Sequence, residues 1–193
     1  MTEPRLPALA VDEWDPELRE LLDRGVLVGD GAVLNVFATL AHHPKLFKRW
    51  LVFANHVLAK STLDARAREI LILRIGWLCG APYEWGQHVV IGRQVGITER
   101  EIAAIAEGSG DGLWNDRDAT LLRAVDELFA YRTISDATYA ALAADYSNEQ
   151  LLDIVFAVGQ YQLVSTALNT FLVQRDDGLT DIPVPTPAYA NPS

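Results

Sequence analysis

Apolar residues along this chain recur at helical spacing, and no run of residues alternates between apolar and polar in the manner of a half-buried strand. Residues 44–60 give the clearest case, because their apolar positions fall on one broad stripe of a helix. The members of that stripe are Leu46, Phe47, Trp50, Leu51, Phe53, Ala54, Val57 and Leu58. The fold is therefore predicted to be all-α, with this stripe facing a core.

Capping residues and glycines mark where the predicted helices end. A central helix is expected to be capped by Ser61 or Thr62 and to run to about Gly80. The other helices are predicted over 15–24, 33–41, 44–60, 82–95, 98–107, 118–131, 136–146 and 148–173.

The chain has 193 residues, which suits one domain, and we place that domain at 15–174. Residues 1–14 are interpreted as an N-terminal extension. Residues 175–193 contain four prolines and are interpreted as a disordered tail or as an arm laid on a neighbouring subunit.

Charge and cysteine content exclude several classes of function. The net charge of −10 disfavours binding to nucleic acid or to an anionic membrane surface, because both require clustered Lys and Arg. The first residues lack the basic start and apolar run of a signal peptide, so a cytoplasmic location is expected. Cys79 is the only cysteine, which leaves no internal disulfide, no Cys-x-x-Cys redox pair and no thiolate zinc site.

Three ionisable residues lie in segments that otherwise have the composition of a core. Glu69 belongs to the central helix, while Glu84 and His88 are four residues apart and so project from one face of the next helix. A carboxylate at that distance can orient an imidazole, as general acid–base catalysis requires. The structural alternative is that Glu69 pairs with a nearby arginine and that Glu84, favoured by the helix dipole in a first turn, is a partner of His88.

Residues near this pair are candidates for binding a substrate. Tyr83 and Trp85 flank Glu84 and are predicted to wall a pocket, although aromatic residues at such spacing are more often plain core. His56 is predicted to line the same cavity, and Arg68 or Arg74 to face charge that develops on a substrate. No spacing of His, Asp and Glu matches a closed metal site, so neither a metal nor another cofactor is expected.

Over most of its length the chain resembles the carboxymuconolactone decarboxylase family, which includes the alkylhydroperoxidase D branch. The resemblance is carried by Asn35-Val36-Phe37, His42-His43-Pro44, Arg68-Glu69, Tyr83-Glu84-Trp85, His88 and Gly96 to Ile102. It implies an all-α, alkylhydroperoxidase D-like subunit built around a central helix pair. It also implies assembly into a trimer or hexamer, with the site near the start of the second helix and near a subunit boundary.

The branches of this family differ at the candidate catalytic positions and at the positions of the redox cysteines. The peroxidase branch would have cysteines where this chain has Ala81 and Glu84, while Glu69 and His88 match it. Disulfide-based peroxide reduction is therefore not expected. The lactone decarboxylases resemble this chain in the glutamate four residues before the histidine, but they are shorter and have no acid at position 69.

The predicted function is that of a cofactor-independent acid–base enzyme, a decarboxylase or isomerase that acts on a small lactone or aromatic-derived carboxylate. His88 is predicted to be the general acid or base, Glu84 to orient it or share the proton transfer, and Glu69 to supply a second carboxylate. Two alternatives stay open: a peroxidase-type antioxidant protein that uses Cys79 with an external thiol, and a non-catalytic binding or structural oligomer. A homo-oligomer is expected because the polar stripe Gln162-Thr166-Asn169 on an apolar helix suits subunit packing.

Overall fold

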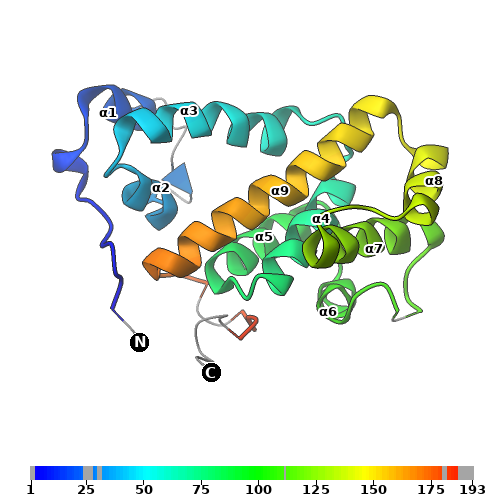
Figure 1. Ribbon diagram of the computed structural model, residues 1–193. Coiled ribbons are helices and arrows are strands. Elements are labelled where there is room, and N and C mark those ends of the chain that lie inside the picture. Colours follow the sequence, from blue (N-terminus) through cyan, green and yellow to red (C-terminus); the bar gives the residue numbers. More distant parts are fainter. Residues whose placement is uncertain (1–2, 24–27, 30–31, 111, 180–181, 187–193) are drawn as a thin grey trace.

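The protein is almost entirely helical, as the computed structural model shows for residues 3–23, 28–29, 32–110, 112–179 and 182–186. The α-helices in these ranges are α1 (Pro16–Asp23), α2 (Asn35–Leu40), α3 (Pro44–Asn55), α4 (Ala65–Leu78), α5 (Pro82–Gln94), α6 (Glu99–Glu107), α7 (Asp116–Tyr131), α8 (Asp136–Asp145) and α9 (Asn148–Phe171). Figure 1 shows α9 running diagonally across the molecule, with α1 to α3 on one side of it and α4 to α8 on the other. The all-α prediction is confirmed.

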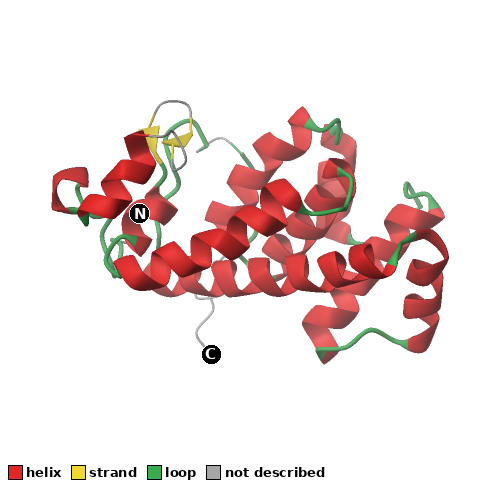
Figure 2. Ribbon diagram, turned by 90° about the horizontal axis from the view of Figure 1, so that it is seen from above, coloured by secondary structure: helices red, strands yellow, loops and turns green. Residues whose placement is uncertain are grey.

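Smaller elements complete the fold. A 3₁₀ turn (Val11–Glu13) precedes α1, and a π-helical turn (His56–Lys60) extends α3. The strands β1 (Val28–Gly29) and β2 (Ala32–Val33) pair antiparallel in a minimal hairpin, drawn in yellow in Figure 2. Strands of two residues are too short to show alternation, so the sequence pattern did not indicate them.

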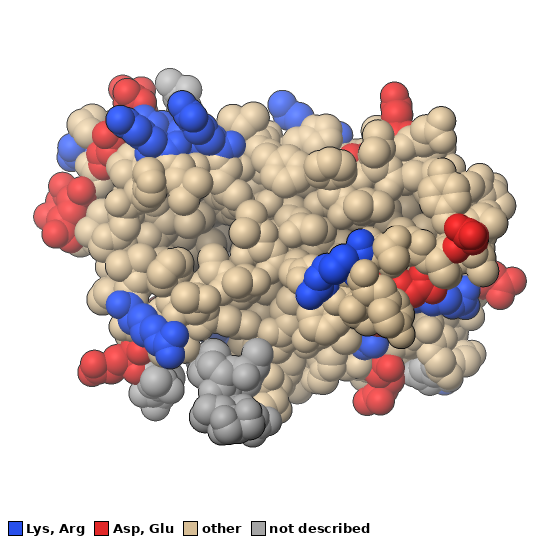
Figure 3. All heavy atoms as spheres, in the orientation of Figure 1, with Lys and Arg blue, Asp and Glu red and all other residues tan. Residues whose placement is uncertain are grey.

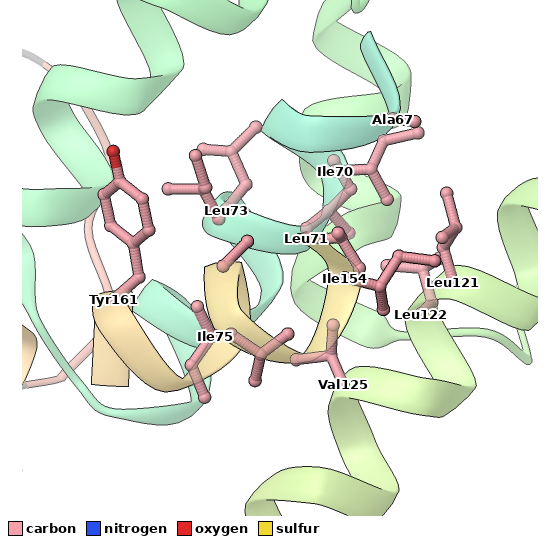
Figure 4. Packing of buried hydrophobic residues seen from close by; sticks show 14 of the residues in the cluster. Ala67, Ile70, Leu71, Leu73, Ile75, Leu121, Leu122, Val125, Ile154 and Tyr161 are labelled. Carbon is pink, nitrogen blue, oxygen red and sulfur yellow. The ribbon is translucent and has the colours of Figure 1, made fainter. Parts of the chain in front are cut away.

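Helix α4 is the centre of the core, because every residue from Glu69 to Gly76 is buried. Ile70, Leu71, Ile72, Leu73 and Ile75 are all fully buried. The helix packs against α5, α7 and α9. Figure 4 shows apolar side chains from α4, α7 and α9 pointing toward one another in this core. A helix that is buried on every side also holds its ionisable side chains away from water.

The start of α4 differs from the prediction. Asp64 caps the helix, and its Oδ1 accepts the backbone N–H of Ala67 at 2.8 Å. The prediction that Ser61 or Thr62 caps it was wrong, because both hydroxyls donate to Asp153 of α9, at 3.0 and 2.8 Å. Those hydrogen bonds tie the connection before α4 to α9.

A three-residue connection, 79–81, makes α4 and α5 antiparallel neighbours. Gly80 adopts a φ of 56° where α4 ends, and Pro82 begins α5. Gly76 of α4 faces this turn, since a Cβ added there would lie in ordinary van der Waals contact with Cγ of Glu84, at 3.6 Å. The first turn of α5 is therefore held against α4.

The N-terminal segment is part of the domain. Trp14 is 2% exposed and packs edge-on against Phe47 in a second core between α1, α2 and α3. The N–H of Leu9 donates to the carbonyl of Ala38 at 3.1 Å. Leu9 and Trp14 therefore join the predicted N-terminal extension to the domain, because their side chains belong to this second core, while residues 10–13 between them are exposed.

The described part of the C-terminal tail packs on its own chain. The N–H of Asn35 donates to Asp176 at 2.8 Å, and the indole N–H of Trp85 donates to the carbonyl of Pro183 at 2.8 Å. Residues 175–179 and 182–186 therefore lie on α2 and α5 of their own chain and are not a disordered end. Contact of the tail with a neighbouring subunit stays a prediction. Residues 187–193, which belong to the same prediction, lie outside the described residues.

One side of the molecule exposes apolar side chains of α3 and α9. Figure 3 shows it as a broad area with few charged side chains. We call it the α3–α9 face, and it consists of Leu46, Phe53, Leu152, Val155, Phe156 and Leu163. By length and composition α9 could cross a membrane, but half of its apolar window is buried inside the protein. The other half gives the α3–α9 face its apolar character.

Candidate active site

Glu69, Glu84 and His88 form a buried chain of hydrogen bonds between α4 and α5. Nδ1 of His88 lies 2.6 Å from Oε2 of Glu69, and Nε2 of His88 lies 2.9 Å from Oε1 of Glu84. None of the three residues is more than 5% exposed. The structure therefore brings together the three predicted catalytic residues, which we call the trio.

The trio holds its imidazole in the charged form. Burial by itself lowers the pKa of His88, but the charges and hydrogen bonds of Glu69 and Glu84 outweigh burial and raise that pKa to about 10. At neutral pH the ring therefore donates one N–H to each carboxylate. Nε of Arg68 donates to Oε1 of Glu69 at 3.2 Å, so two positive and two negative charges balance at this site.

A cavity of about 200 Å³ adjoins the trio, and we call it the site cavity. Glu84, His88 and Tyr83 line it, whereas Glu69 lies behind His88 and does not. Most of the remaining wall is apolar, formed by Leu34, Val36, Phe37, Trp50, Leu51, Ala54, Leu58, Ile91 and Val164. Oε2 of Glu84 has no hydrogen-bond partner among the described residues. Both nitrogens of His88 are occupied, so Glu84 is the member of the trio with a free oxygen for a ligand.

Two neighbouring residues of α9 that the sequence did not single out complete this cavity. The ring of Tyr161 stands edge-on to that of His88, with centroids 4.8 Å apart, and its hydroxyl has no hydrogen-bond partner among the described residues. Burial is the main cause that raises the pKa of Tyr161 well above its usual value, so the hydroxyl keeps its proton as a donor. Gln160 lines the cavity too, and its Oε1 is buried without a partner.

The polar stripe Gln162-Thr166-Asn169 on α9, which was predicted to contact another subunit, makes hydrogen bonds within its own chain. Asn169 donates to the carbonyl of Cys79 at 2.9 Å, and Thr166 donates to the carbonyl of Gln162 within α9 at 2.8 Å. Gln160 was visible in the sequence as an interruption of an apolar helix. On a helix that is apolar almost all round, however, the pattern does not indicate which polar residue faces the site.

Asp176, from the C-terminal tail, fixes two polar residues of the cavity wall. Its Oδ2 accepts the hydroxyl of Tyr83 and the side-chain amide of Gln87, both at 2.5 Å. Burial and the carboxylate of Asp176 together raise the pKa of Tyr83 far above its usual value. Tyr83 therefore lines the cavity as predicted, but its proton is already donated to Asp176. No sequence pattern indicated this contact, because the two residues are 93 positions apart.

Removal of the Asp176 carboxylate should destabilise the protein. We expect Asp176→Ala to lower the free energy of unfolding by about 1–3 kcal/mol, because Tyr83, Gln87 and the N–H of Asn35 lose their acceptor. Asp177→Ala is the matched control, since Asp177 is the exposed neighbour in the same tail, and its effect should stay within about 0.5 kcal/mol. Urea unfolding measures both variants, and equal values would show that the Asp176 contacts add no stability.

Two of the predicted substrate-binding residues lie away from the cavity. Trp85 stands edge-on to Trp77, with centroids 4.9 Å apart, and points toward Pro183. His56 is exposed at a separate surface groove, where its Nε2 lies 3.6 Å from Oδ1 of Asp153. The predictions for Trp85 and His56 were wrong, because each side chain projects from its helix in a direction that does not reach the site cavity.

The two candidate arginines are bound to carboxylates. Arg68 contacts the trio through Glu69 but does not line the cavity. Arg74 donates to Asp126 at 2.7 Å and to the backbone carbonyls of Ile105 and Ala106 in the last turn of α6. Neither is placed to bind a substrate directly.

Two further features bear on the chemistry of the site: the state of the Cys79 thiol and the grouping of possible metal ligands in the described residues. Cys79 is partly buried, and burial raises the pKa of its thiol to about 11, so at neutral pH it carries its proton. Among the residues that the structure describes, no group of three or more His, Cys, Asp or Glu could hold a metal ion.

The sequence profile of the carboxymuconolactone decarboxylase family matches residues 44–127. That segment begins with α3, includes most of α7 and contains the whole trio. A search of curated proteins finds no significant match.

Several solved structures share the fold. The alkylhydroperoxidase AhpD core of an uncharacterised peroxidase-related protein from Ralstonia eutropha JMP134 is 20% identical, with a TM-score of 0.79 over 93% of this chain and 95% of that one. An uncharacterised peroxidase-related protein from Silicibacter sp. TM1040 is 16% identical, with a TM-score of 0.79 over 94% and 98%. A cysteine-to-alanine variant of the debrominase Bmp8, in complex with 2,3,4-tribromopyrrole, is 16% identical, with a TM-score of 0.74 over 93% and 95%. At these identities the likeness shows the fold alone.

Proposed function

Because residues 44–127 belong to the carboxymuconolactone decarboxylase family, we propose that the protein is a cofactor-independent acid–base enzyme, a decarboxylase or isomerase of a small lactone or related ring compound. The observation that carries this proposal is the position of Glu84 on the wall of a mostly apolar cavity, with His88 and Glu69 aligned behind it. Paired ionisable groups with perturbed pKa values beside a cavity are typical of acid–base sites.

In this proposal Glu84 exchanges the proton with the substrate, a role that the sequence assigned first to His88. For an isomerisation, Oε2 of Glu84 removes a proton from a carbon next to a carbonyl, and the electrons of the C–H bond move to the carbonyl oxygen. Returning the proton to another carbon of the conjugated system completes the reaction. For a decarboxylation, the C–C bond to the carboxylate breaks and its electrons stay on the ring compound as carbon dioxide leaves. The imidazolium of His88 gives its Nε2 proton to Glu84, Glu84 passes a proton to carbon, and water returns one to His88.

The other groups of the site assist Glu84. Tyr161 donates to the oxygen on which negative charge develops. The imidazolium of His88 stabilises the carboxylate form of Glu84, and Glu69 holds the ring in place through Nδ1. Glu69 and His88 thereby act through Glu84 and set its proton affinity.

A ligand panel tests the proposal. Small lactones, hydroxylated ring compounds and ring carboxylates are screened by ligand-induced thermal shift, and compounds that bind are assayed for turnover. Because the debrominase of the same fold binds 2,3,4-tribromopyrrole, halogenated pyrroles belong in the panel. Turnover that survives in Glu84→Gln would refute the proposal.

We expect no thiol-dependent reduction of organic hydroperoxides above background. The single thiol, Cys79, is protonated at neutral pH and has no second cysteine with which to form a disulfide. The measurement compares the wild type with Cys79→Ser in a dithiol-coupled peroxidase assay, where both rates should be equal. A large loss of rate in Cys79→Ser would support the antioxidant alternative.

We also propose that the protein is a homo-oligomer whose subunits meet through the α3–α9 face. Monomeric proteins rarely leave a continuous apolar area of this kind in contact with water. Light scattering at micromolar concentrations tests the proposal, and a monomer would contradict it.

A further inference from the structure

The site cavity offers no free cationic N–H to an anionic ligand, because both nitrogens of the one cation in its described lining, His88, are bound to Glu69 and Glu84. Among the described residues that line it, Glu84 and His88 are the two that carry charge at neutral pH, and their charges cancel. Arg68 is bound to Glu69 on the far side of the imidazole. A carboxylate in this cavity would lose its hydration and would also lie beside the carboxylate of Glu84. Both effects oppose an anion.

Gln160 supplies a hydrogen-bond acceptor that nothing in the described protein uses. The residue is 4% exposed, and its Oε1 is buried without a partner. The last torsion of a glutamine side chain is broad, so the amide can turn toward the cavity without leaving its rotamer. A ligand that donates a hydrogen bond there satisfies a group that is otherwise costly to bury. Tyr83 and Gln87, by contrast, are already bound to Asp176.

A second cavity, of about 170 Å³, lies between α2, α3 and α9, and we call it the apolar cavity. Thr39 is the one residue in its described lining with a polar side chain apart from the indole of Trp50. It shares Val36, Trp50 and Val164 with the site cavity, so the two are separated by no more than this layer of side chains. An apolar substituent on a ligand held at Glu84 therefore has apolar space beside it.

We infer that the site selects neutral ring compounds that carry a hydrogen-bond donor at one end and an apolar substituent at the other, and that it rejects carboxylates of the same shape. Gln160 recognises the donor, and the apolar cavity takes the substituent. The inference rests on the proposed function for the location of the site. Of the two proposed reactions it selects isomerisation, because a decarboxylation needs a carboxylate substrate.

Three ligands of matched shape test the inference by calorimetric titration at neutral pH: 4-butylphenol, 4-butylbenzoate and 4-butylanisole. The wild type should bind the phenol about tenfold more tightly than either of the others, because the benzoate is charged and the anisole lacks the donor. In Gln160→Met, which keeps the shape and removes the acceptor, the advantage of the phenol over the anisole should shrink to about threefold or less. Gln160→Leu serves the same purpose if the first variant does not fold.

A fourth ligand, 4-methylphenol, tests the apolar cavity. The wild type should prefer the butyl to the methyl compound by about tenfold or more, because each buried methylene contributes to affinity. Ala167→Leu fills the apolar cavity from a position that does not line the site cavity, so it should abolish this preference and leave the binding of 4-methylphenol unchanged.

Each contrary result overturns a defined part of the inference. Benzoate binding as tight as phenol binding, or no binding of any ligand up to millimolar concentrations, refutes the neutral ligand class. An unchanged ratio of phenol to anisole affinity in both Gln160 variants refutes the role of Gln160, and a retained butyl preference in Ala167→Leu refutes the role of the apolar cavity. Failure of the proposed function would show differently, as turnover that does not depend on Glu84, because these titrations do not measure turnover.

Discussion

Replacing Glu84 by glutamine should lower the turnover of the true substrate by about a hundredfold or more, the range for loss of a general acid–base group. The amide keeps the shape of the side chain and its place on the cavity wall but cannot accept the substrate proton. His88→Ala should lower the rate by a similar factor, because Glu84 then loses the imidazolium at 2.9 Å that sets its proton affinity. Glu107→Gln, an exposed change at the end of α6, is the matched control and should leave the rate unchanged.

A double variant shows whether Glu84 and His88 act on the rate together or independently. If Glu84 and His88 act as one relay, Glu84→Gln with His88→Ala should cost much less than the product of the single effects. Glu69→Gln should have a smaller effect than Glu84→Gln, because Glu69 does not line the cavity. Full activity in Glu84→Gln, or strictly multiplicative effects in the double variant, would reduce the trio to a structural hydrogen-bond chain. Steady-state kinetics under saturating and limiting substrate provide the measurement.

His88→Leu should also destabilise the fold by about 3–5 kcal/mol at neutral pH, the usual cost of removing one partner from a buried ion pair. Both Glu69 and Glu84 would lose their shared cation, and both are buried. His56→Leu is the matched control, because the His56 side chain is 55% exposed, and it should change stability by about 0.5 kcal/mol or less. Chemical unfolding of the three proteins measures these differences.

The difference in stability between the wild type and His88→Leu should also depend on pH. The folded protein raises the pKa of His88 to about 10, from a usual value of 6.5. The bound proton therefore stabilises the fold fully below pH 6.5, and this contribution is lost as the pH rises toward the folded pKa. Between pH 7 and 9.5 the wild type should lose at least about 1.4 kcal/mol more than His88→Leu, because one pKa unit corresponds to about that energy. Parallel curves of stability against pH would show that the trio does not hold the proton.

The sequence predicted the helices well because their signals are local. Thr98 and Glu101 form the expected capping box of α6, and Gly80 and Pro82 mark the turn between α4 and α5. The same short turn, together with the spacing of Glu84 and His88, predicted that these two residues would meet Glu69, and they do. That prediction succeeded because the geometry of two adjacent helices depends on few residues.

Other parts of the site depend on contacts between segments that are far apart in the chain. Asp176 binds Tyr83 across 93 positions, and the sequence between them contains nothing that indicates the contact. Trp85 is next to Glu84 in sequence but turns toward the C-terminal tail, since neighbouring residues on a helix point about 100° apart. The orientation of Gln160 was equally hidden, because α9 is apolar on nearly every side.

The sequence by itself determined the all-α class, the central helix pair and the convergence of Glu69, Glu84 and His88, because each depends on periodicity, caps and a short turn. Only the tertiary structure decided that both nitrogens of His88 are occupied and that Glu84 presents a free oxygen to the cavity. It also decided that the tail closes over Tyr83 and that Gln160 and Tyr161 complete the wall. The physical reason is that a cavity is formed by side chains from several helices at once, and the direction of each side chain depends on how those helices pack.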